Sequence, residues 1–347
     1  MDEQIAGIIT SAISNNILPG CTIGYIKNNK LTVLPFGRLT YDQDSSFVTK
    51  DTIYDVASIT KVIPTSTLVL QLIDEGILHV SDKVIKYVPE ITSKYREKLT
   101  ILHLLTHTVS FSFRLSSVKT NSADELLEKL FKTEYTNKPG SSFHYSNGAS
   151  ILLGIVIERV TNTTLDELAK NRFFNPLGMK RTMFGSRAID KRNIAPTEID
   201  TNRGTVHGTV HDESAAILEK KRVVGSAGLF STAEDLLSFL NMLLGDGTIK
   251  GKRFFSKHMV TQMYTNQLDL VGVSTGLGWE LNQPRFMGQN CAGTTFGKTG
   301  FTGCMVVCDV AKQVGLVMLS NEIFPQRKAN KLRINRIRSQ LADIVFD

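Results

Sequence analysis

The 347-residue sequence has only four cysteines, the residue whose disulfides crosslink small secreted proteins. It also has only one tryptophan. Cys304 and Cys308 fall in one strand-like run, where a rise of about 3.3 Å per residue places them about 13 Å apart. This distance exceeds the reach of a disulfide, and no Cys-x-x-Cys pair is present. We therefore expect free thiols, no disulfide framework and no zinc site.

Long hydrophobic runs and a secretory signal are also missing. No segment approaches the roughly 18 consecutive apolar residues of a membrane-spanning helix. The chain opens with the acidic Asp2 and Glu3, not with the basic start and apolar core of a signal peptide. We expect a cytoplasmic location without a membrane span, or export if the N-terminus has been trimmed.

The sequence has fewer acidic than basic residues. It contains 33 aspartates and glutamates and 40 lysines and arginines, which gives a net charge of +7. Much of the excess falls in residues 327–338, beside the apolar Leu332, Ile337 and Leu341. A basic amphipathic helix can bind nucleic acid or an acidic membrane surface. We interpret this one as a packed helix with a solvated face and expect no nucleic-acid partner, while the oligomeric state stays open.

Strand-like runs lie near both ends of the chain. They cover residues 21–26, 31–36, 278–281, 294–297, 303–310 and 314–320. Residues 58–263 are mainly helical in pattern, and a last helix is predicted over about 326–345. This order predicts an α+β fold, with one antiparallel sheet formed from both chain ends and flanked by helices.

We expect a single domain over 1–347 with two subdomains. The sheet subdomain covers about 1–65 and 270–347, and the mainly helical subdomain covers about 66–269. Residues 186–224 are polar and irregular in pattern, and their length indicates a covering loop at a functional site.

The stretch Ser58-Ile59-Thr60-Lys61 can form an activated serine on one helical turn. Residues three apart on a helix have β-carbons about 5–6 Å apart, so the Lys61 amine can reach the Ser58 hydroxyl. Serine needs such a neighbouring base to become a nucleophile. A second Ser-x-x-Lys copy begins at Ser116 in a polar stretch, and we interpret it as a solvated loop.

Two more motifs supply a proton partner and a cation. Tyr-x-Asn occurs three times, but only the copy at Tyr145 and Asn147 follows a Pro-Gly-led loop that can project both side chains into a cleft. Lys-Thr-Gly at 298–300 leads into a strand-like run, where glycine often marks the close approach of a ligand or another backbone. The three motifs together predict one site.

These motifs resemble those of the serine β-lactamase-related family, which joins class C β-lactamases, low-molecular-weight penicillin-binding proteins with D,D-carboxypeptidase activity, and family VIII esterases. Segments 54–58, 104–108 and 228–236 are also similar to that family, so the resemblance spans nearly the whole chain. It implies a β-lactamase/transpeptidase-like fold. Ser110 stands where the family usually has glycine, which bears on substrate fit more than on chemistry.

The resemblance implies a catalytic role for three residues. Ser58 would be the nucleophile that forms an acyl-enzyme, and Lys61 would shape its proton affinity. Tyr145 would act as general base and pass the proton to the leaving group. Which of Lys61 and Tyr145 takes the first proton is left open, because the two would titrate as a coupled pair. Nearby cations, Lys61 and Lys298, would lower the pKa of Tyr145.

The substrate-binding residues implied in the same way are Asn147, Lys298, Thr299, Gly300 and Phe301. Asn147 would hold the substrate amide or Lys61. Lys298 would bind a carboxylate, such as that of a penicillin or a D-Ala-D-Ala terminus. The backbone N–H groups of Ser58 and Phe301 would form an oxyanion hole. Neither a metal nor a cofactor is implied.

Three functions stay open on this evidence. The first is a serine hydrolase of β-lactamase or D,D-peptidase type that acts on a carboxylate-bearing amide or β-lactam, with a small molecule or peptide as substrate. The second is an esterase or D-amino-acid amidase that uses the same site. The third is a penicillin-binding protein that is acylated without turnover.

Overall fold

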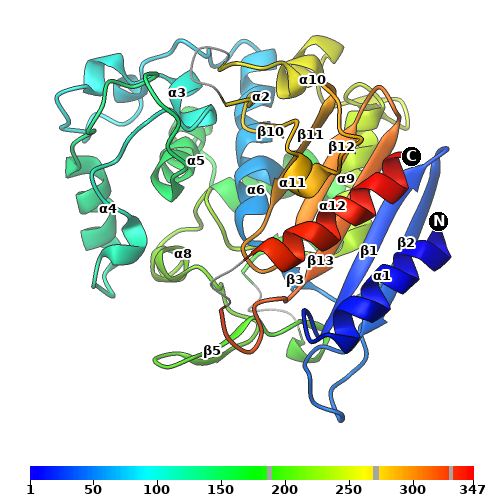
Figure 1. The fold of residues 1–347 in the computed structure, drawn as a ribbon. Helices are drawn as coiled ribbons and strands as arrows, with labels where there is room; N and C mark the ends of the chain where they lie inside the picture. The colour runs from blue at the N-terminus through cyan, green and yellow to red at the C-terminus, as the bar shows by residue number, and fades with distance from the viewer. Residues whose placement is uncertain (186–189, 269–272, 328–330) are drawn as a thin grey trace.

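The computed structural model describes residues 1–185, 190–268, 273–327 and 331–347. Its main sheet has six antiparallel strands in the order β10-β11-β12-β13-β1-β2, as Figure 1 shows. Their bounds are β1 (Gly20–Lys27), β2 (Lys30–Gly37), β10 (Glu280–Leu281), β11 (Thr295–Thr299), β12 (Met305–Asp309) and β13 (Val314–Ser320). Because β1 pairs with β13, the sheet is formed from both chain ends, and the predicted α+β fold is confirmed.

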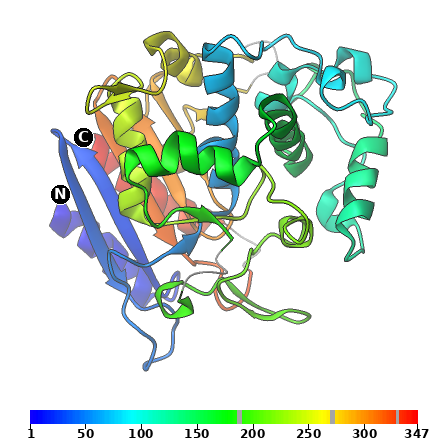
Figure 2. The same cartoon turned by 180° about the vertical axis from the view of Figure 1, so that it is seen from behind.

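Both faces of this sheet are covered, which explains its continuous apolar strands. In β13, Leu316 and Met318 belong to one apolar cluster and Val317 and Leu319 to the other, as the two-residue period of a strand requires. Helices α1 (Asp2–Ser14), α11 (Pro284–Met287) and α12 (Leu332–Phe346) lie on one face (Figure 1). Helix α9 (Ala233–Leu244) covers the opposite face (Figure 2).

The middle of the chain forms the helical region beside the sheet (Figure 1). Its helices are α2 (Thr67–Asp74), α3 (Ile101–Leu105), α4 (Ala123–Lys132), α5 (Asn147–Thr161), α6 (Leu165–Ala169), α7 (Asn175–Leu177), α8 (Glu213–Leu218) and α10 (Lys257–Tyr264). Its short strands are β3 (Tyr54–Asp55), β4 (Met183–Phe184), β5 (Glu198–Asp200), β6 (Gly204–Val206), β7 (Leu229–Ser231), β8 (Thr248–Ile249) and β9 (Lys252–Arg253). The predicted division of the chain into a sheet subdomain and a helical subdomain, with boundaries near residues 65 and 270, stays a prediction.

Two predicted segments differ from the structure. The last helix begins at Leu332, whereas the prediction began it near residue 326. Arg327 Nε donates hydrogen bonds of 2.9 Å to both carboxylate oxygens of Glu198. Residues 328–330 lie outside the described residues. The predicted covering loop contains the β5–β6 hairpin and α8, with 186–189 also outside the description. Among the described helices, none has the length and hydropathy to cross a bilayer.

Candidate active site

The proposed nucleophile lies on a constrained turn between β3 and α2. Residues Ala57–Lys61 form a 3₁₀ helix, and Ala57 has a φ of +47°, which non-glycine residues rarely adopt. The Asp55 carboxylate stabilises this turn by accepting a hydrogen bond of 2.8 Å from the Ala57 N–H. The sequence pattern predicted one helix from Ser58 onward, but the extended backbone of Ile63 interrupts it and α2 begins at Thr67.

Ser58 and Lys61 lie together on this turn. The Lys61 ammonium donates to Ser58 Oγ at 3.1 Å and to the Ser226 carbonyl oxygen at 2.7 Å. Only 1% of the Lys61 side chain is exposed, whereas Ser58 is half-buried at the surface of the cleft. A buried amine that contacts the hydroxyl is positioned to exchange a proton with it.

Tyr145 reaches the same hydroxyl from the loop before α5. The loop is fixed by the His144 N–H, which donates to the His107 carbonyl oxygen at 2.7 Å. The Tyr145 ring centroid lies 4.9 Å from that of His107, and 47% of the Tyr145 side chain is exposed. Its hydroxyl lies near enough to Ser58 for that side chain to help lower the pKa of Tyr145, after Lys298 and Lys61. The loop therefore places a phenol beside the serine.

Two lysines surround this phenol. Lys298 Nζ lies 4.4 Å and Lys61 Nζ 5.2 Å from the centroid of the Tyr145 ring. Burial opposes ionisation of the phenol, but the positive charges of Lys298 and Lys61 outweigh it and lower the pKa of Tyr145. A phenol with a lowered pKa is a better general base near neutral pH.

Lys298 on β11 is itself paired with a carboxylate that the sequence analysis did not single out. Its Nζ lies 2.7 Å from Glu280 Oε1, and Glu280 also binds Arg285 at 2.7 Å. Burial opposes the charge of Lys298, but the carboxylate outweighs it and raises the pKa of Lys298. Glu280 lies opposite Gly297 in the β10–β11 register, so only the strand pairing could have revealed this contact.

The end of β11 contacts the turn that carries Ser58. A Cβ on Gly300 would overlap the Val56 carbonyl oxygen, so glycine is required for this close approach. The next residue, Phe301, lines the same cavities as Ser58. The backbone N–H groups of these two residues are therefore the candidates for an oxyanion hole.

The close approach at Gly300 yields a testable prediction. We expect Gly300→Ala to lower kcat/KM by about 100-fold or more, because displacing a reacting group by 1 Å can cost that much. The matched control is Gly293→Ala, since no heavy atom lies within 4 Å of a Cβ at Gly293. Kinetics and thermal unfolding of both variants would check this, and full activity of a folded Gly300→Ala would contradict it.

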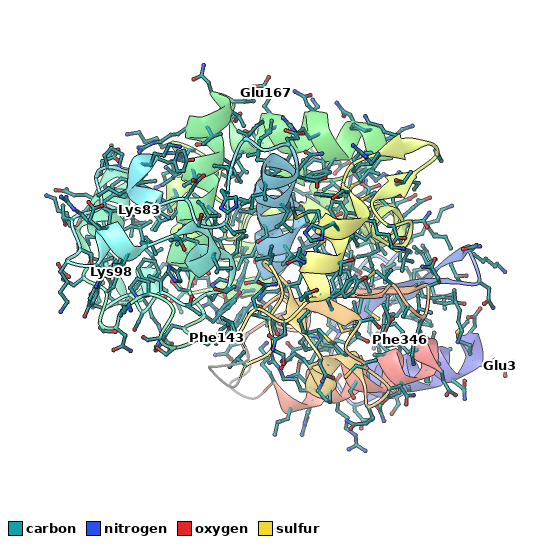
Figure 3. The ribbon with its side chains drawn as sticks, turned by 90° about the horizontal axis from the view of Figure 1, so that it is seen from above. Glu3, Lys83, Lys98, Phe143, Glu167 and Phe346 are labelled. Atoms are coloured by element: carbon teal, nitrogen blue, oxygen red, sulfur yellow. The ribbon has the colours of Figure 1, made fainter. Side chains whose placement is uncertain are left out.

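Two cavities meet at Ser58. The smaller, of about 410 Å³, has a charged wall and is lined in part by Thr275, Glu280, Arg285, Lys298, Thr299, Lys331, Asn335 and Arg338. The larger, of about 870 Å³, is lined in part by Phe111, Phe113, Phe143, Asn147, Asp212 and Arg327. Phe143 lies where the helical region meets the sheet and α12 (Figure 3). A substrate bound across Ser58 can therefore place one half in each cavity.

Arg338 of α12 is a site residue that the sequence analysis missed. It was included in a solvated basic face, but only 4% of its side chain is exposed. It donates to the carbonyl oxygens of Gly300 at 3.1 Å and Cys304 at 3.0 Å and to Asn335 Oδ1 at 2.9 Å. Its buried Nε has no partner, and burial lowers the pKa of Arg338 to about 10. It both fixes the turn after β11 and adds positive charge to the smaller cavity.

Asn147 begins α5 at the edge of the larger cavity. The sequence analysis assigned its amide to the substrate or to Lys61, but the structure pairs its Nδ2 with Asp212 Oδ2 at 3.0 Å. Asp212 was not among the predicted site residues, because only the folded chain brings the two segments together.

The described residues contain no group of three or more histidine, cysteine, aspartate or glutamate side chains that could hold a metal ion. Cys21, Cys291, Cys304 and Cys308 are free thiols.

The chain is similar to known proteins along most of its length. A family model described as Beta-lactamase matches residues 6–339. A protein of Escherichia coli O157:H7 named "Putative D-alanyl-D-alanine carboxypeptidase" is 30% identical over 344 residues, which cover 88% of this chain and 78% of that protein.

Solved structures share the fold. The octameric penicillin-binding protein homologue from Pyrococcus abyssi is 24% identical, with a TM-score of 0.75 over 92% of this chain and 74% of that one. EstCE1, a hydrolase with promiscuous acyltransferase activity, is 20% identical, with a TM-score of 0.77 over 100% of this chain and 98% of that one. At these identities the likeness establishes the fold alone.

Proposed function

Because the chain belongs to the beta-lactamase family, we propose that it cleaves a carboxylate-bearing amide or β-lactam through an acyl-enzyme on Ser58. The observation that carries this proposal is the contact of the Ser58 hydroxyl with both the Lys61 ammonium and the Tyr145 phenol. An adjacent base is what a serine requires to become a nucleophile.

The reaction follows from these contacts. The Ser58 O–H bond breaks as its proton passes to the deprotonated member of the Lys61–Tyr145 pair, either the phenolate or the neutral amine, while Oγ bonds to the substrate carbonyl carbon. The N–H groups of Ser58 and Phe301 receive the developing oxyanion, and each such donor is worth roughly 3–4 kcal/mol in the transition state. Collapse then breaks the C–N bond as the leaving nitrogen takes the proton back. Water then gives a proton to the same pair as its oxygen bonds to the acyl carbon. The C–Oγ bond breaks, Ser58 Oγ takes the proton back, and the acid leaves.

The charges of the smaller cavity favour an anionic leaving group. Four cationic side chains lie on its wall, those of Arg285, Lys298, Lys331 and Arg338. Two carboxylates, Glu280 and Glu322, form ion pairs with three of them. The four positive and two negative charges leave an excess of two positive charges. A substrate carboxylate placed there would be stabilised by its surroundings. The name of the carboxypeptidase relative is consistent with such a substrate.

An esterase or D-amino-acid amidase remains the second candidate. The ion pair between Lys298 and Glu280 favours this second candidate. Lys298 is the cation expected to bind a substrate carboxylate, and Glu280 already neutralises its charge. A chromogenic cephalosporin, a p-nitrophenyl ester and a fluorescent penicillin separate the candidates. Turnover of the cephalosporin supports the first function, turnover of the ester alone supports the second, and a stable adduct without turnover supports a penicillin-binding protein.

The role of Lys298 in substrate choice can be measured directly. We expect Lys298→Met to lower kcat/KM for an anionic substrate about tenfold or more beyond its effect on a neutral ester, since a charge-assisted hydrogen bond is lost only with the anion. The comparison should be made at the pH optimum of each variant, because Lys298 also lowers the pKa of Tyr145. Equal losses for both substrates would contradict carboxylate binding by Lys298.

A further inference from the structure

Asp55 is a buried carboxylate that contacts both the nucleophile turn and the segment before α8. Only 2% of Asp55 is exposed. Its Oδ1 accepts a hydrogen bond from the Ala57 N–H and its Oδ2 accepts one from the His211 N–H, each of 2.8 Å. Burial raises the pKa of Asp55 to about 6, although the two N–H groups oppose this rise. Near neutral pH the group is therefore mainly a carboxylate, which accepts both hydrogen bonds.

The same residue contacts the turn that follows β11. The Asp55 carbonyl oxygen accepts a hydrogen bond of 2.8 Å from the hydroxyl of Thr302, which is buried. The His211 ring also reaches this turn, because it stacks on the Phe301 ring with centroids 5.6 Å apart and 22° between the ring planes. Asp55 is therefore linked to the turn directly through Thr302 and indirectly through His211.

These links end beside the two candidate donors of the oxyanion hole. Ala57 immediately precedes Ser58, and Thr302 immediately follows Phe301. The donors belong to separate segments, since Ser58 follows β3 and Phe301 follows β11. Each donor must lie about 2.7–3.1 Å from the oxyanion, so the distance between the two segments has to be held closely. A residue joined to the neighbours of both donors can hold it.

We propose that Asp55 is a positioning residue that keeps the two N–H groups of the oxyanion hole, those of Ser58 and Phe301, at the separation that acyl transfer requires. This inference rests on the proposed function, because the oxyanion forms when a substrate carbonyl is attacked by Ser58. Asp55 is buried, and its carboxylate oxygens accept from backbone N–H groups. It therefore acts on the donors and not on the substrate.

Asp55→Asn tests this role without changing the size of the side chain. A carboxylate accepts through both oxygens, whereas the asparagine side chain has one accepting oxygen and one donating NH₂ group. That NH₂ group must face either the Ala57 N–H or the His211 N–H, donor against donor. One of the two links is therefore lost whichever way the amide turns.

The measurement compares p-nitrophenyl phenylacetate with its thionoester, in which C=S replaces C=O. Sulfur is a weak hydrogen-bond acceptor, so correctly placed N–H donors favour the ester more than the thionoester. In Asp55→Asn we expect kcat/KM for the ester to fall about 100-fold, because a displacement of 1 Å can cost that much. The ratio of the ester value to the thionoester value should fall about tenfold or more.

The loss should appear in the acylation rate constant measured by stopped-flow and not in binding of the ester, because the oxyanion is absent from the bound ground state. A residue that only stabilised the fold would leave the ratio of the two substrates unchanged.

Asp309→Asn is the matched control. Asp309 is also a buried aspartate whose two oxygens both accept, Oδ1 from the Thr294 hydroxyl at 2.9 Å and Oδ2 from the Thr295 hydroxyl. It pairs with Thr295, the first residue of β11, whereas Phe301 follows the other end of that strand. We expect this variant to keep the ratio even if its thermal stability falls.

Equal losses for the ester and the thionoester in Asp55→Asn, or an equal fall of the ratio in Asp309→Asn, would overturn the inference. Acylation of Ser58 by a fluorescent penicillin would still uphold the proposed function in that case. If the unaltered protein released no p-nitrophenolate and formed no penicillin adduct, the proposed function and the inference would both be removed.

Thr302→Val takes the place of Asp55→Asn if the latter does not fold, as thermal unfolding would show. Valine has the shape of threonine but lacks the hydroxyl that donates to the Asp55 carbonyl oxygen, so the ratio should again fall. Thr302→Ser retains the hydroxyl and should retain the ratio. An unchanged ratio in folded Thr302→Val would equally defeat the inference.

Discussion

Replacement of Ser58 by alanine is expected to lower kcat/KM by at least about 10⁴-fold for every substrate, since removal of a serine nucleophile has effects of this size or larger in other hydrolases. The variant should also fail to form a covalent adduct with a fluorescent penicillin. Hydrolysis rates and intact-protein mass spectrometry would measure the two effects.

The matched control for this substitution is Ser116→Ala. Ser116 begins the second Ser-x-x-Lys copy, and its exposed side chain lies on the wall of the larger cavity. We expect near-normal turnover, because no contact links it to the Lys61–Tyr145 pair in the described part of the chain. Persistent hydrolysis in folded Ser58→Ala, or a comparable loss in Ser116→Ala, would refute the assignment of the nucleophile.

The second large effect is expected for Tyr145→Phe. Phenylalanine keeps the ring that packs 4.9 Å from His107 but removes the hydroxyl that contacts Ser58. Loss of a general base lowers rates by about 10²–10⁴-fold, and the loss should appear in the acylation step measured by stopped-flow. Thermal unfolding should change little.

The pH profile identifies the same group. Burial disfavours the phenolate, but Lys298 and Lys61 outweigh burial and lower the pKa of Tyr145. Activity of the unaltered protein should therefore rise with pH through a limb below the ordinary tyrosine pKa of about 10, and this limb should be absent in Tyr145→Phe. Tyr264→Phe, in another Tyr-x-Asn copy whose hydroxyl contacts Thr261 at 3.3 Å, serves as control. An unchanged limb in Tyr145→Phe would contradict the assignment of Tyr145 as the general base.

Local patterns were sufficient to predict the fold. The runs that became β1 and β13 are rich in β-branched and apolar residues, and their positions at opposite ends of the chain indicated a sheet formed from both. The prediction of one continuous helix after Ser58 was wrong. The pattern of apolar residues persists through Ile63, although the backbone there is extended. Hydrophobic periodicity reports which side chains are buried, not whether the backbone between them is helical.

The candidate site was predictable where a short motif marks its residues, as at Ser58, Tyr145 and Lys298, which line one cavity. Ser58 and Lys61 share one turn, so their spacing was enough to bring them together. Glu280 meets Lys298 through strand register, and Asp212 meets Asn147 across a sequence separation of 65 residues. These partners depend on tertiary structure, and no single motif contains both members of either pair.

The pairing of β1 with β13 also affects how the chain folds during synthesis. Strand β1 leaves the ribosome early, yet its neighbour is completed only at Ser320, so one edge of the nascent sheet stays open through most of translation. Such long-range pairing slows folding and exposes apolar strand edges to aggregation. Yield of active enzyme should therefore depend on chaperone supply and on temperature during expression.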